Sequence, residues 1–219
     1  MSRQPFQEDT MRIAIIGVGN VGGGLARAAV AAGHDVVLSA AHPDKARATA
    51  EATGARAAES NTAAVDGAQV VVLAVPGVDA PAVAAELAPA LAGAVVVDAT
   101  NPLDETYSDL AITGTSGAEA VQQAVGAVPV VKAFNTVFAS RYAAPTENGE
   151  PLQVLIAADD ADARARVAEL ATSLGFAPID AGGLRLARSL EEIAFLNITL
   201  NATKGWAWQS AFQLVGPTA

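Results

Sequence analysis

Three glycines near the start of the chain have the spacing of a phosphate-binding turn. They form the pattern G-x-G-x-x-G in Gly17-Val18-Gly19-Asn20-Val21-Gly22, between an apolar run at 13–16 and an alanine-rich run at 25–32. In a strand–turn–helix unit the first glycine permits the tight turn, the second lets the backbone approach a pyrophosphate, and the third lets the helix pack closely on the sheet. The amides and the positive dipole at the helix start would then face the phosphates. This order predicts a dinucleotide site, with a plain structural turn as the alternative.

The residues after the next apolar run bear on which dinucleotide is bound. The expected strand at 35–39 is followed by Ala40, Ala41, His42, Pro43, Asp44 and Lys45. No carboxylate lies at the strand end, where NAD-binding proteins use one to bind the ribose 2′-hydroxyl. Ser39, His42 and Lys45 could accommodate a 2′-phosphate instead, although the arginine that binds phosphate in a bidentate way is missing. We therefore favour NADP, the alternative being an ordinary strand end followed by solvated side chains.

Other residues that could do chemistry are few, and this excludes several kinds of site. The chain has no cysteine and only two histidines, His34 and His42. Thiol chemistry and disulfides are therefore excluded, and a metal centre is not expected. The sequence contains no Ser/His/Asp set, and neither Tyr107 nor Tyr142 has a lysine four residues later, as a Tyr-x-x-x-Lys dehydrogenase would. We assign no catalytic residue from the sequence.

The overall charge and hydropathy narrow the range of partners. The chain has 219 residues, 52% of them hydrophobic, and a formal net charge of −10. It can bury a sizeable core, and its charge argues against nucleic acid or an anionic membrane as a partner. No apolar run reaches the roughly 20 residues that a membrane span needs. Residues 1–10 are polar and lack a signal-peptide core, so we expect a loose tail and a cytoplasmic protein.

Apolar and amphipathic stretches alternate along most of the chain, and they indicate the elements that position these residues. The alternation predicts an α/β fold of Rossmann type, with a doubly wound, mainly parallel sheet. Strands are expected at 13–16, 35–39, 55–58, 69–75, 94–98, 129–134, 152–157 and 176–179, and helices at 25–32, 43–53, 79–91, 118–125 and 161–174. A surface loop is expected at 144–149. We divide the chain into the tail at 1–10, a dinucleotide-binding domain at 11–180 and a C-terminal helical segment at 181–219.

The C-terminal segment has apolar residues on more than one helical face. Residues with helical spacing run from Ile193 to Leu214, while Trp206 and Trp208 fall on other faces. A helix that is apolar on several faces is usually buried on more than one side. We expect the segment to be largely helical from Leu184 onward, to complete a cleft and to form a homodimer interface. The two tryptophans are interpreted as core or interface residues rather than as a platform for a flavin.

Five segments together resemble the F420-dependent NADP reductases. They are the glycine-rich start at 11–22, AVP at 74–76, DATNPL at 98–103, VKAFNTV at 131–137 and DAGGLRLARSLE at 180–191. The same segments are similar to a wider group of predicted dinucleotide-binding oxidoreductases, which includes the cytosolic domains of the STEAP metalloreductases. The resemblance covers nearly the whole chain after the tail. It implies NADP as cofactor and coenzyme F420, or a flavin, as second substrate.

The resemblance also implies where the cofactor would lie. The phosphate loop of the family corresponds to residues 18–21, and its 2′-phosphate site to the segment from Ser39 to Lys45. The residues implied on the ribose and adenine side are Ala74, Val75 and Pro76, and those beside the nicotinamide are Asn101, Ala133 and Asn135. Arg188 would help to form the cleft for the second substrate. Its plain alternative is a surface pair with Glu191, three residues further along a helix.

Hydride transfer between a nicotinamide and a deazaflavin needs alignment and exclusion of water rather than a strong acid or base. The absence of an acid–base set agrees with that reaction, with a flavin as a variant of the acceptor. One alternative is an NADP-dependent dehydrogenase or imine reductase that acts on a small carbonyl or imine, for which Lys204 is the one plausible acid–base residue. The other is a non-catalytic NADP-binding module that senses redox state. The expected partner is a small redox substrate, without nucleic acid or membrane.

Overall fold

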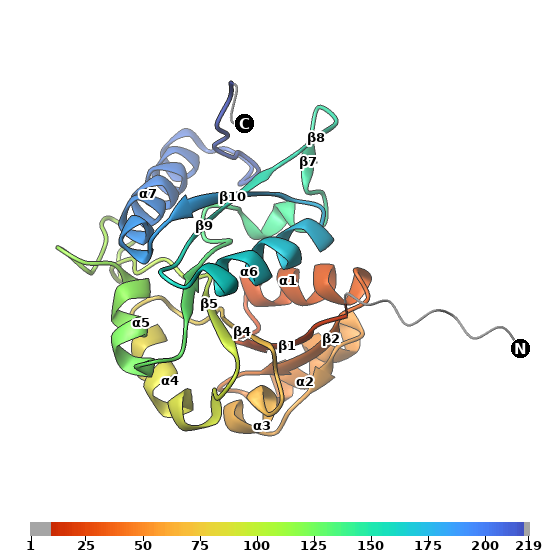
Figure 1. The fold of residues 1–219 in the computed structure, drawn as a ribbon. Coiled ribbons are helices and arrows are strands. Elements are labelled where there is room, and N and C mark those ends of the chain that lie inside the picture. Colours follow the sequence, from red (N-terminus) through yellow and green to blue (C-terminus); the bar gives the residue numbers. More distant parts are fainter. Residues whose placement is uncertain (1–9, 217–219) are drawn as a thin grey trace, which may run out of the picture.

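The fold is built on one mixed sheet of eight strands (Figure 1). The computed structural model describes residues 10–216, so the tail predicted at 1–10 lies almost entirely outside the described residues. The strands are β1 (Arg12–Ile16), β2 (Asp35–Ser39), β3 (Arg56–Ala57), β4 (Val70–Leu73), β5 (Val95–Asp98), β6 (Val130–Lys132), β9 (Gln153–Ala157) and β10 (Ala177–Gly182). Their order across the sheet is β10-β9-β6-β5-β4-β1-β2-β3. The doubly wound α/β fold predicted from the sequence is confirmed.

The sheet is parallel except at one edge. The pairs from β3 to β6 are all parallel, whereas β9 pairs with β6 in the antiparallel direction and β10 runs parallel to β9. The carboxyl ends of β1, β4, β5 and β6 therefore meet at one edge of the sheet. In open α/β sheets this edge is where ligands bind.

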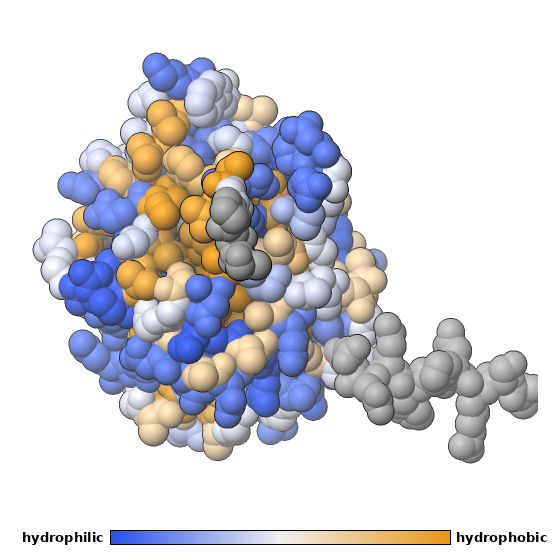
Figure 2. Space-filling view, turned by 45° about the horizontal axis from the view of Figure 1, so that its top comes forward, coloured by the Kyte–Doolittle hydropathy of each residue, from blue (hydrophilic) through white to orange (hydrophobic). Residues whose placement is uncertain are grey.

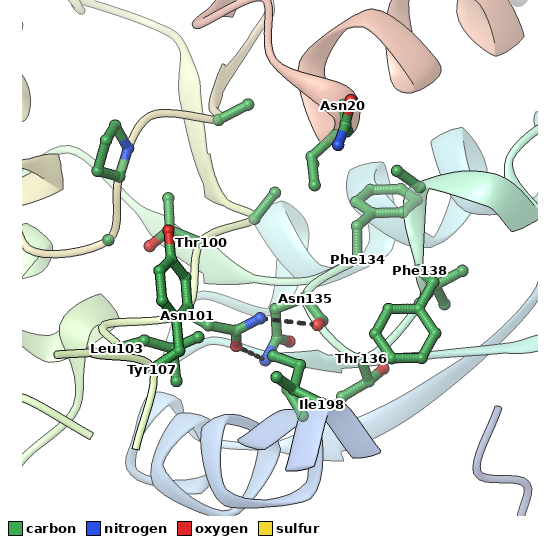
Figure 3. A pocket seen from close by; sticks show the side chains of 18 of the residues that line it. Asn20, Thr100, Asn101, Leu103, Tyr107, Phe134, Asn135, Thr136, Phe138 and Ile198 are labelled. Atoms are coloured by element: carbon green, nitrogen blue, oxygen red, sulfur yellow. Dashed lines mark hydrogen bonds between the residues drawn. The ribbon is translucent and has the colours of Figure 1, made fainter. Parts of the chain in front are cut away.

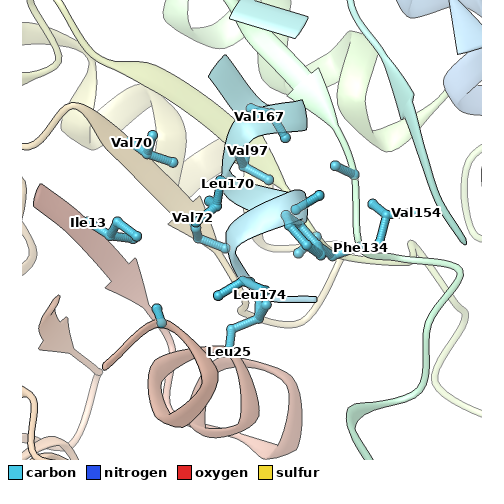
Figure 4. Close-up of a cluster of buried hydrophobic side chains, with 14 of the residues drawn as sticks. Ile13, Leu25, Val70, Val72, Val97, Phe134, Val154, Val167, Leu170 and Leu174 are labelled. Carbon is cyan, nitrogen blue, oxygen red and sulfur yellow. The ribbon is translucent and has the colours of Figure 1, made fainter. Parts of the chain in front are cut away.

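Helices cover both faces of the sheet. They are α1 (Asn20–Ala31), α2 (Pro43–Thr53), α3 (Asn61–Val65), α4 (Ala80–Leu87), α5 (Gly117–Val125), α6 (Ala161–Ser173) and α7 (Ala187–Lys204). Successive strand residues point to opposite faces, so Ile13 and Ile15 pack with α1 and α6 in one core, drawn in Figure 4, while Ala14 and Ile16 pack with α3, α4 and α5 in the other. Both cores consist mostly of valine, alanine, leucine and isoleucine, as the continuous apolar runs indicated.

Two predicted segments differ from the structure. The expected loop at 144–149 contains part of a hairpin, β7 (Thr146–Glu147) and β8 (Glu150–Pro151). The turn between them is Asn148-Gly149, and both residues have positive φ. Such a pair favours a tight hairpin turn.

The largely helical segment expected up to Leu214 is wrong beyond Lys204. Helix α7 ends there, and Gly205 caps it in the left-handed conformation with φ 64°. Residues 205–216 are irregular and return to the body of the protein, where the Gln153 side chain pairs with the backbone of Leu214. Residues 207, 211 and 214 thus lie in an irregular strap, residues 205–216, rather than in a helix, and of the three only Ala211 is partly buried against the core. Within residues 10–216 no helix is long and apolar enough to cross a membrane.

Candidate active site

The glycine turn has the geometry that its spacing predicts. Gly17 has φ +105° and donates its amide to the Ser39 carbonyl at 2.8 Å, and a Cβ on it would overlap the carbonyl of Ala74. A Cβ on Gly22 would overlap the carbonyl of Gly17. Gly19 is different, because among residues 10–216 no heavy atom outside Gly19 and its two chain neighbours lies within 4 Å of where its Cβ would be. The protein itself thus leaves the surface of Gly19 open, as a site for a close ligand requires.

The start of α1 fits an anionic group. Gly19 is the N-cap residue in an extended conformation, no side chain caps the helix, and the first turn contains no acidic residue. The first amides of a helix have no carbonyl partner within it, so here they and the positive helix dipole are free to bind a pyrophosphate. These features fit the dinucleotide site that the glycine motif predicts at residues 17–22.

A cleft of about 1420 Å³ opens at the carboxyl ends of β1, β4, β5 and β6 (Figure 3). Its wall is completed by α7 and by the strap. The cleft is larger than the roughly 300–1,000 Å³ typical of a site for one small ligand, so it has room for two ring systems. Of the sequence-predicted site residues, those that line it are Asn20, Val21, Ala74, Val75, Pro76, Asn101 and Asn135. Val18 and Gly19 line a neighbouring groove along α1.

Asn101 and Asn135 are joined at the floor of the cleft. Asn101 Nδ2 donates to the Asn135 carbonyl at 3.1 Å, and Asn135 Nδ2 donates to Asn101 Oδ1 at 3.0 Å and to the Leu190 carbonyl at 3.0 Å. Figure 3 shows the first two bonds as dashed lines. Because both hydrogens of Asn135 Nδ2 are used, its Oδ1 faces away from these partners, and it is a buried acceptor without a partner. An amide donor such as a carboxamide would satisfy it.

Ala133 does not line the cleft, contrary to the sequence prediction. It is fully buried in the hydrophobic core next to α6. The reason is the backbone after β6, which turns at Phe134 with φ 66°. This turn directs the residues from Phe134 to Ser140, rather than Ala133, along the cleft wall.

The segment expected to bind a 2′-phosphate is only partly available. The Ser39 side chain is buried, and its hydroxyl donates to Asn61 Oδ1 at 2.8 Å. Ala40 is half-buried, whereas His42, at the N-cap of α2, and Lys45 are exposed. His42 and Lys45 therefore remain the candidates for this contact, and the Ser39 hydroxyl is already engaged.

A buried ionic cluster beside the cleft was missed by the sequence analysis. Lys132 Nζ lies 2.9 Å from Asp98 Oδ2, 2.8 Å from Glu191 Oε1 and 2.7 Å from the Thr100 carbonyl, and all three side chains are buried. Burial raises the pKa of the Glu191 carboxyl, and the charge of Asp98 acts in the same direction. A lysine inside a valine-rich strand was the available signal, because a buried charge requires a partner.

The pairing considered for Arg188 is wrong. Glu191 turns inward to the cluster, and Arg188 instead binds Glu119 of α5 through two bonds of 2.7 and 2.8 Å. This contact, helped by the Ser116 hydroxyl, holds the pKa of Glu119 at about 2. Arg188 thus fastens α7 to α5 and is not among the residues that line the cleft. Asp180 closes a turn by accepting from the amide of Gly182 at 2.7 Å.

Aromatic side chains are concentrated in the cleft. The chain has six phenylalanines, two tryptophans and two tyrosines, and the cleft is lined by Tyr107, Phe134, Phe138 and Trp208. The interpretation of Trp208 as a core or interface residue is therefore corrected, since it faces the cleft from the strap. Lys204 is exposed in the last turn of α7 and is not among the lining residues. Among residues 10–216 no cluster of three histidine or acidic side chains could hold a metal ion.

Comparison with known proteins decides the family. The family model described as NADP oxidoreductase, coenzyme F420-dependent, matches residues 12–102. The F420-dependent NADP reductase of Methanothermobacter marburgensis is 32% identical, over 87% of this chain and 92% of the relative. The chain belongs to the F420-dependent NADP reductase family. The corresponding reductase of Methanothermobacter thermautotrophicus is 33% identical over 87% and 89% of the two chains. The protein is thus an NADP-dependent oxidoreductase.

Other similarities agree with this family. Rat (Rattus norvegicus) metalloreductase STEAP3 is 39% identical over 107 residues, which are 49% of this chain and 21% of STEAP3. A crystal structure of a candidate F420-dependent NADP reductase from Arthrobacter sp. FB24 superposes with a TM-score of 0.81 at 30% identity, over 94% of this chain and all of that one. An imine reductase from Pseudomonas sp. has a TM-score of 0.68 at 18% identity, which indicates a shared fold alone.

Proposed function

We propose that this family member transfers a hydride between NADP(H) and the deazaflavin coenzyme F420, and that both bind in the cleft at the strand ends. The observation that carries the proposal is the combination of a wide cleft, an aromatic lining and an open glycine turn at its edge. Two flat rings need space, apolar surfaces and close approach, and this cleft offers all three. Two full-length reductase relatives support the same pair of substrates.

In this proposal the residues of the chain bind the cofactor and orient its nicotinamide ring. The amides at the start of α1 would hold the pyrophosphate, and residues 74–76 would line the ribose and adenine side. The unpartnered Oδ1 of Asn135 would accept from the nicotinamide carboxamide, with Asn101 fixing the side chain of Asn135. Bound NADPH supplies the hydride, or NADP⁺ accepts one in the reverse direction. Apolar cleft residues such as Phe138 and Ile198 would exclude water, which favours alignment over side reactions.

The residues that line the cleft give less support to the alternative of a dehydrogenase or imine reductase. A dehydrogenase or imine reductase needs an acid–base group at the reacting carbon, and Lys204 is not among the cleft residues. Asp104, Glu105 and Tyr107 do line the cleft. The amide and hydroxyl of Ser108, together with Thr106, hold the pKa of the Asp104 carboxyl below the ordinary value, so Asp104 would stay ionised and could not donate a proton near neutral pH. A flavin as acceptor and a non-catalytic sensing role are left to experiment, and the cytoplasmic location stays a prediction.

Stopped-flow absorbance tests the proposal. The protein is mixed with NADPH and, in separate runs, oxidised coenzyme F420, FMN, FAD, a small ketone and a cyclic imine. We expect rapid reduction of the deazaflavin, slower reduction of the flavins and none of the carbonyl or imine compounds. Reduction of a carbonyl or imine alone would establish the dehydrogenase alternative. NADPH binding without turnover of any acceptor would indicate the sensing module.

A further inference from the structure

Strained backbone is concentrated in the cleft. Among residues 10–216, four residues other than glycine have positive φ, namely Tyr107 at 57°, Phe134 at 66°, Asn148 at 52° and Trp208 at 57°. Asn148 lies in a hairpin turn, where asparagine adopts this conformation readily. The other three are bulky aromatic residues, for which it is unfavourable, and all three line the cleft. Strain of this kind persists at functional sites where the surrounding structure enforces it.

Tyr107 is held in its strained conformation by a polar turn. The Asp104 carboxylate accepts from the amide and hydroxyl of Thr106 and from the amide and hydroxyl of Ser108, at 2.9–3.0 Å, and the Tyr107 amide donates to the Asp104 carbonyl at 3.0 Å. Yet Tyr107 is 69% exposed. Packing in the core therefore gives no reason for its conformation. The turn presents the ring toward the cleft.

Trp208 is held from the other end of the chain. Its amide donates to Asn201 Oδ1 at 3.1 Å, and its carbonyl accepts from the Ser140 hydroxyl. Asn201 is itself buried and bonded to Ser210 Oγ at 2.7 Å. The indole meets the Phe138 ring edge-on, with centroids 5.4 Å apart. The polar contacts thus fix the strap so that the indole stays in the wall of the cleft.

The two rings belong to different sides of the cleft. Figure 3 shows Tyr107 on one side and Phe138 on the other, with Asn101 and Asn135 between them in that view. Because the Trp208 ring contacts Phe138, it lies on the Phe138 side. The loop with Tyr107 and the strap with Trp208 are joined to the sheet by separate segments. An aromatic side chain is therefore available on each of two sides of the cleft.

We propose that Tyr107 and Trp208 are the residues that hold the ring of the second redox substrate, and that they select large, flat heteroaromatic rings over small carbonyl compounds. This inference rests on the proposed function, because it assigns residues to the acceptor half of the same cleft. Aromatic side chains bind flat heterocycles through stacking. In this interpretation, the strained backbone of Tyr107 and Trp208 keeps their rings in the cleft, where they contact a substrate rather than the core.

Asparagine substitutions separate the ring from the backbone conformation. Asparagine tolerates positive φ better than other residues that have a Cβ, so Tyr107→Asn and Trp208→Asn remove the ring while keeping the turn. Tyr107→Phe and Trp208→Phe keep an aromatic ring. Trp206→Asn is the matched control, because Trp206 is exposed on the same strap but is not among the cleft residues.

The measurements are the Kd of oxidised coenzyme F420 from its fluorescence anisotropy, the Kd of NADPH, and the melting temperature. We expect each asparagine variant at 107 and 208 to raise the Kd of the deazaflavin about tenfold or more, which is about 1.4 kcal/mol. The Kd of NADPH should change less than twofold, and the melting temperature of Tyr107→Asn should hold or rise as strain is relieved. The phenylalanine variants and Trp206→Asn should bind the deazaflavin like the unmodified protein.

Three outcomes would overturn this inference, and only the second of them would also overturn the proposed function. An unmodified protein that reduces the deazaflavin, with asparagine variants of unchanged deazaflavin affinity, would overturn this inference and leave the proposed function standing. An unmodified protein that neither binds nor reduces a deazaflavin or flavin would overturn both. Equal losses of NADPH and deazaflavin affinity, with a lower melting temperature, would show that the rings serve structure only and would also overturn the inference.

Discussion

Gly19 and Gly22 lie three residues apart in one motif, and a side chain would have opposite consequences at the two positions. A Cβ on Gly19 meets nothing within 4 Å, whereas a Cβ on Gly22 overlaps a backbone carbonyl. We predict that Gly19→Val weakens NADPH binding at least tenfold, about 1.4 kcal/mol, and leaves the melting temperature nearly unchanged. Gly22→Ala should instead lower the free energy of unfolding, by about 1–3 kcal/mol, through overpacking.

Nicotinamide fluorescence titration and thermal unfolding measure these two effects. Gly22→Ala serves as the control for a steric clash inside the fold, which lowers the free energy of unfolding. Unchanged NADPH affinity in Gly19→Val would contradict the assignment of the open surface to the pyrophosphate. Loss of folding in Gly19→Val would show that the space around Gly19 belongs to another part of the protein.

Lys45, which is exposed after β2, leads to a prediction about the preference for NADPH over NADH. If a 2′-phosphate docks at the start of α2, Lys45→Ala should weaken NADPH binding several-fold and leave NADH binding nearly untouched. Ser39→Ala is the control, because the Ser39 hydroxyl is bonded to Asn61; it should change stability more than cofactor choice. Replacing Ala40 by arginine should strengthen NADPH binding through a bidentate contact. Equal losses for both cofactors in Lys45→Ala would refute the assignment.

The buried Lys132 cluster predicts that two substitutions within it lower the free energy of unfolding by very different amounts. Lys132→Met leaves the carboxylates of Asp98 and Glu191 buried without a cation, so we expect a loss of about 3–5 kcal/mol in the free energy of unfolding. Glu191→Gln removes one of two carboxylates that share one ammonium group, and it should cost much less. Urea denaturation of both variants measures the difference. Equal destabilisation would mean that packing, and not charge, dominates at this position.

At the scale of single residues, the sequence predicted roles that depend on a local pattern but did not predict contacts between distant segments. The glycine roles follow from spacing alone, because they depend on a contiguous strand–turn–helix unit. Ala133 was misplaced because one left-handed residue, Phe134, changes which side chains face the cleft. The partners of Lys132 come from β5 and α7, and no sequence pattern connects these segments.

His34 links elements and gives the fold a pH dependence. It follows α1, and its Nδ1 accepts from the Met11 amide at 3.1 Å while Nε2 lies 2.8 Å from the Ser173 hydroxyl at the end of α6. Burial lowers the pKa of His34 below its ordinary value of 6.5. The unfolded chain therefore takes up a proton near pH 6.5 that the folded chain resists. Stability should fall as the pH decreases below about 6.5.

Denaturation between pH 5 and pH 8 measures this effect. His34→Gln keeps an acceptor for the Met11 amide but does not titrate, so its free energy of unfolding should lose most of the slope below pH 6.5. His42→Gln is the matched control, since His42 is exposed at the start of α2, and it should keep that slope. A slope that persists unchanged in His34→Gln would assign the pH dependence to other groups.

At the scale of elements, the predicted boundaries agreed best with the structure where the sequence contains residues that start or end a helix. The strand at 35–39 and the helix at 43–53 match β2 and α2 residue for residue, because Pro43 and Gly54 mark the helix ends. The helix expected toward Leu214 failed because its apolar period continues past Gly205, the residue that ends α7. The antiparallel insertion of β9 could not be predicted, since strand direction depends on distant pairing.

The whole molecule presents a hydrophobic face on the side of α7 and the strap. Figure 2 turns this side forward and shows hydrophobic side chains gathered on it. Besides Trp208, which lines the cleft, the exposed large hydrophobic residues of this segment are Leu186, Leu196, Trp206, Phe212, Leu214 and Val215. The sequence predicted that the apolar residues from Ile193 to Leu214 lie on the faces of one helix, whereas the structure divides them between α7 and the irregular strap. Extensive exposed apolar surface commonly marks an interaction site.

We predict that this face forms a homodimer interface between two copies of the chain. Burying it would remove Leu196, which is 50% exposed on α7, and Leu214, 59% exposed on the strap, from water. Light scattering at micromolar concentration should give a particle of twice the chain mass of 22.0 kDa. Leu196→Asp should shift the particle toward the single-chain mass, because it would place a carboxylate in an apolar interface. Ala52→Asp, at an exposed position of α2, should leave the dimer intact. A single-chain mass for the unmodified protein would refute the prediction, and equal shifts in both variants would show that charge alone dissociates the particle.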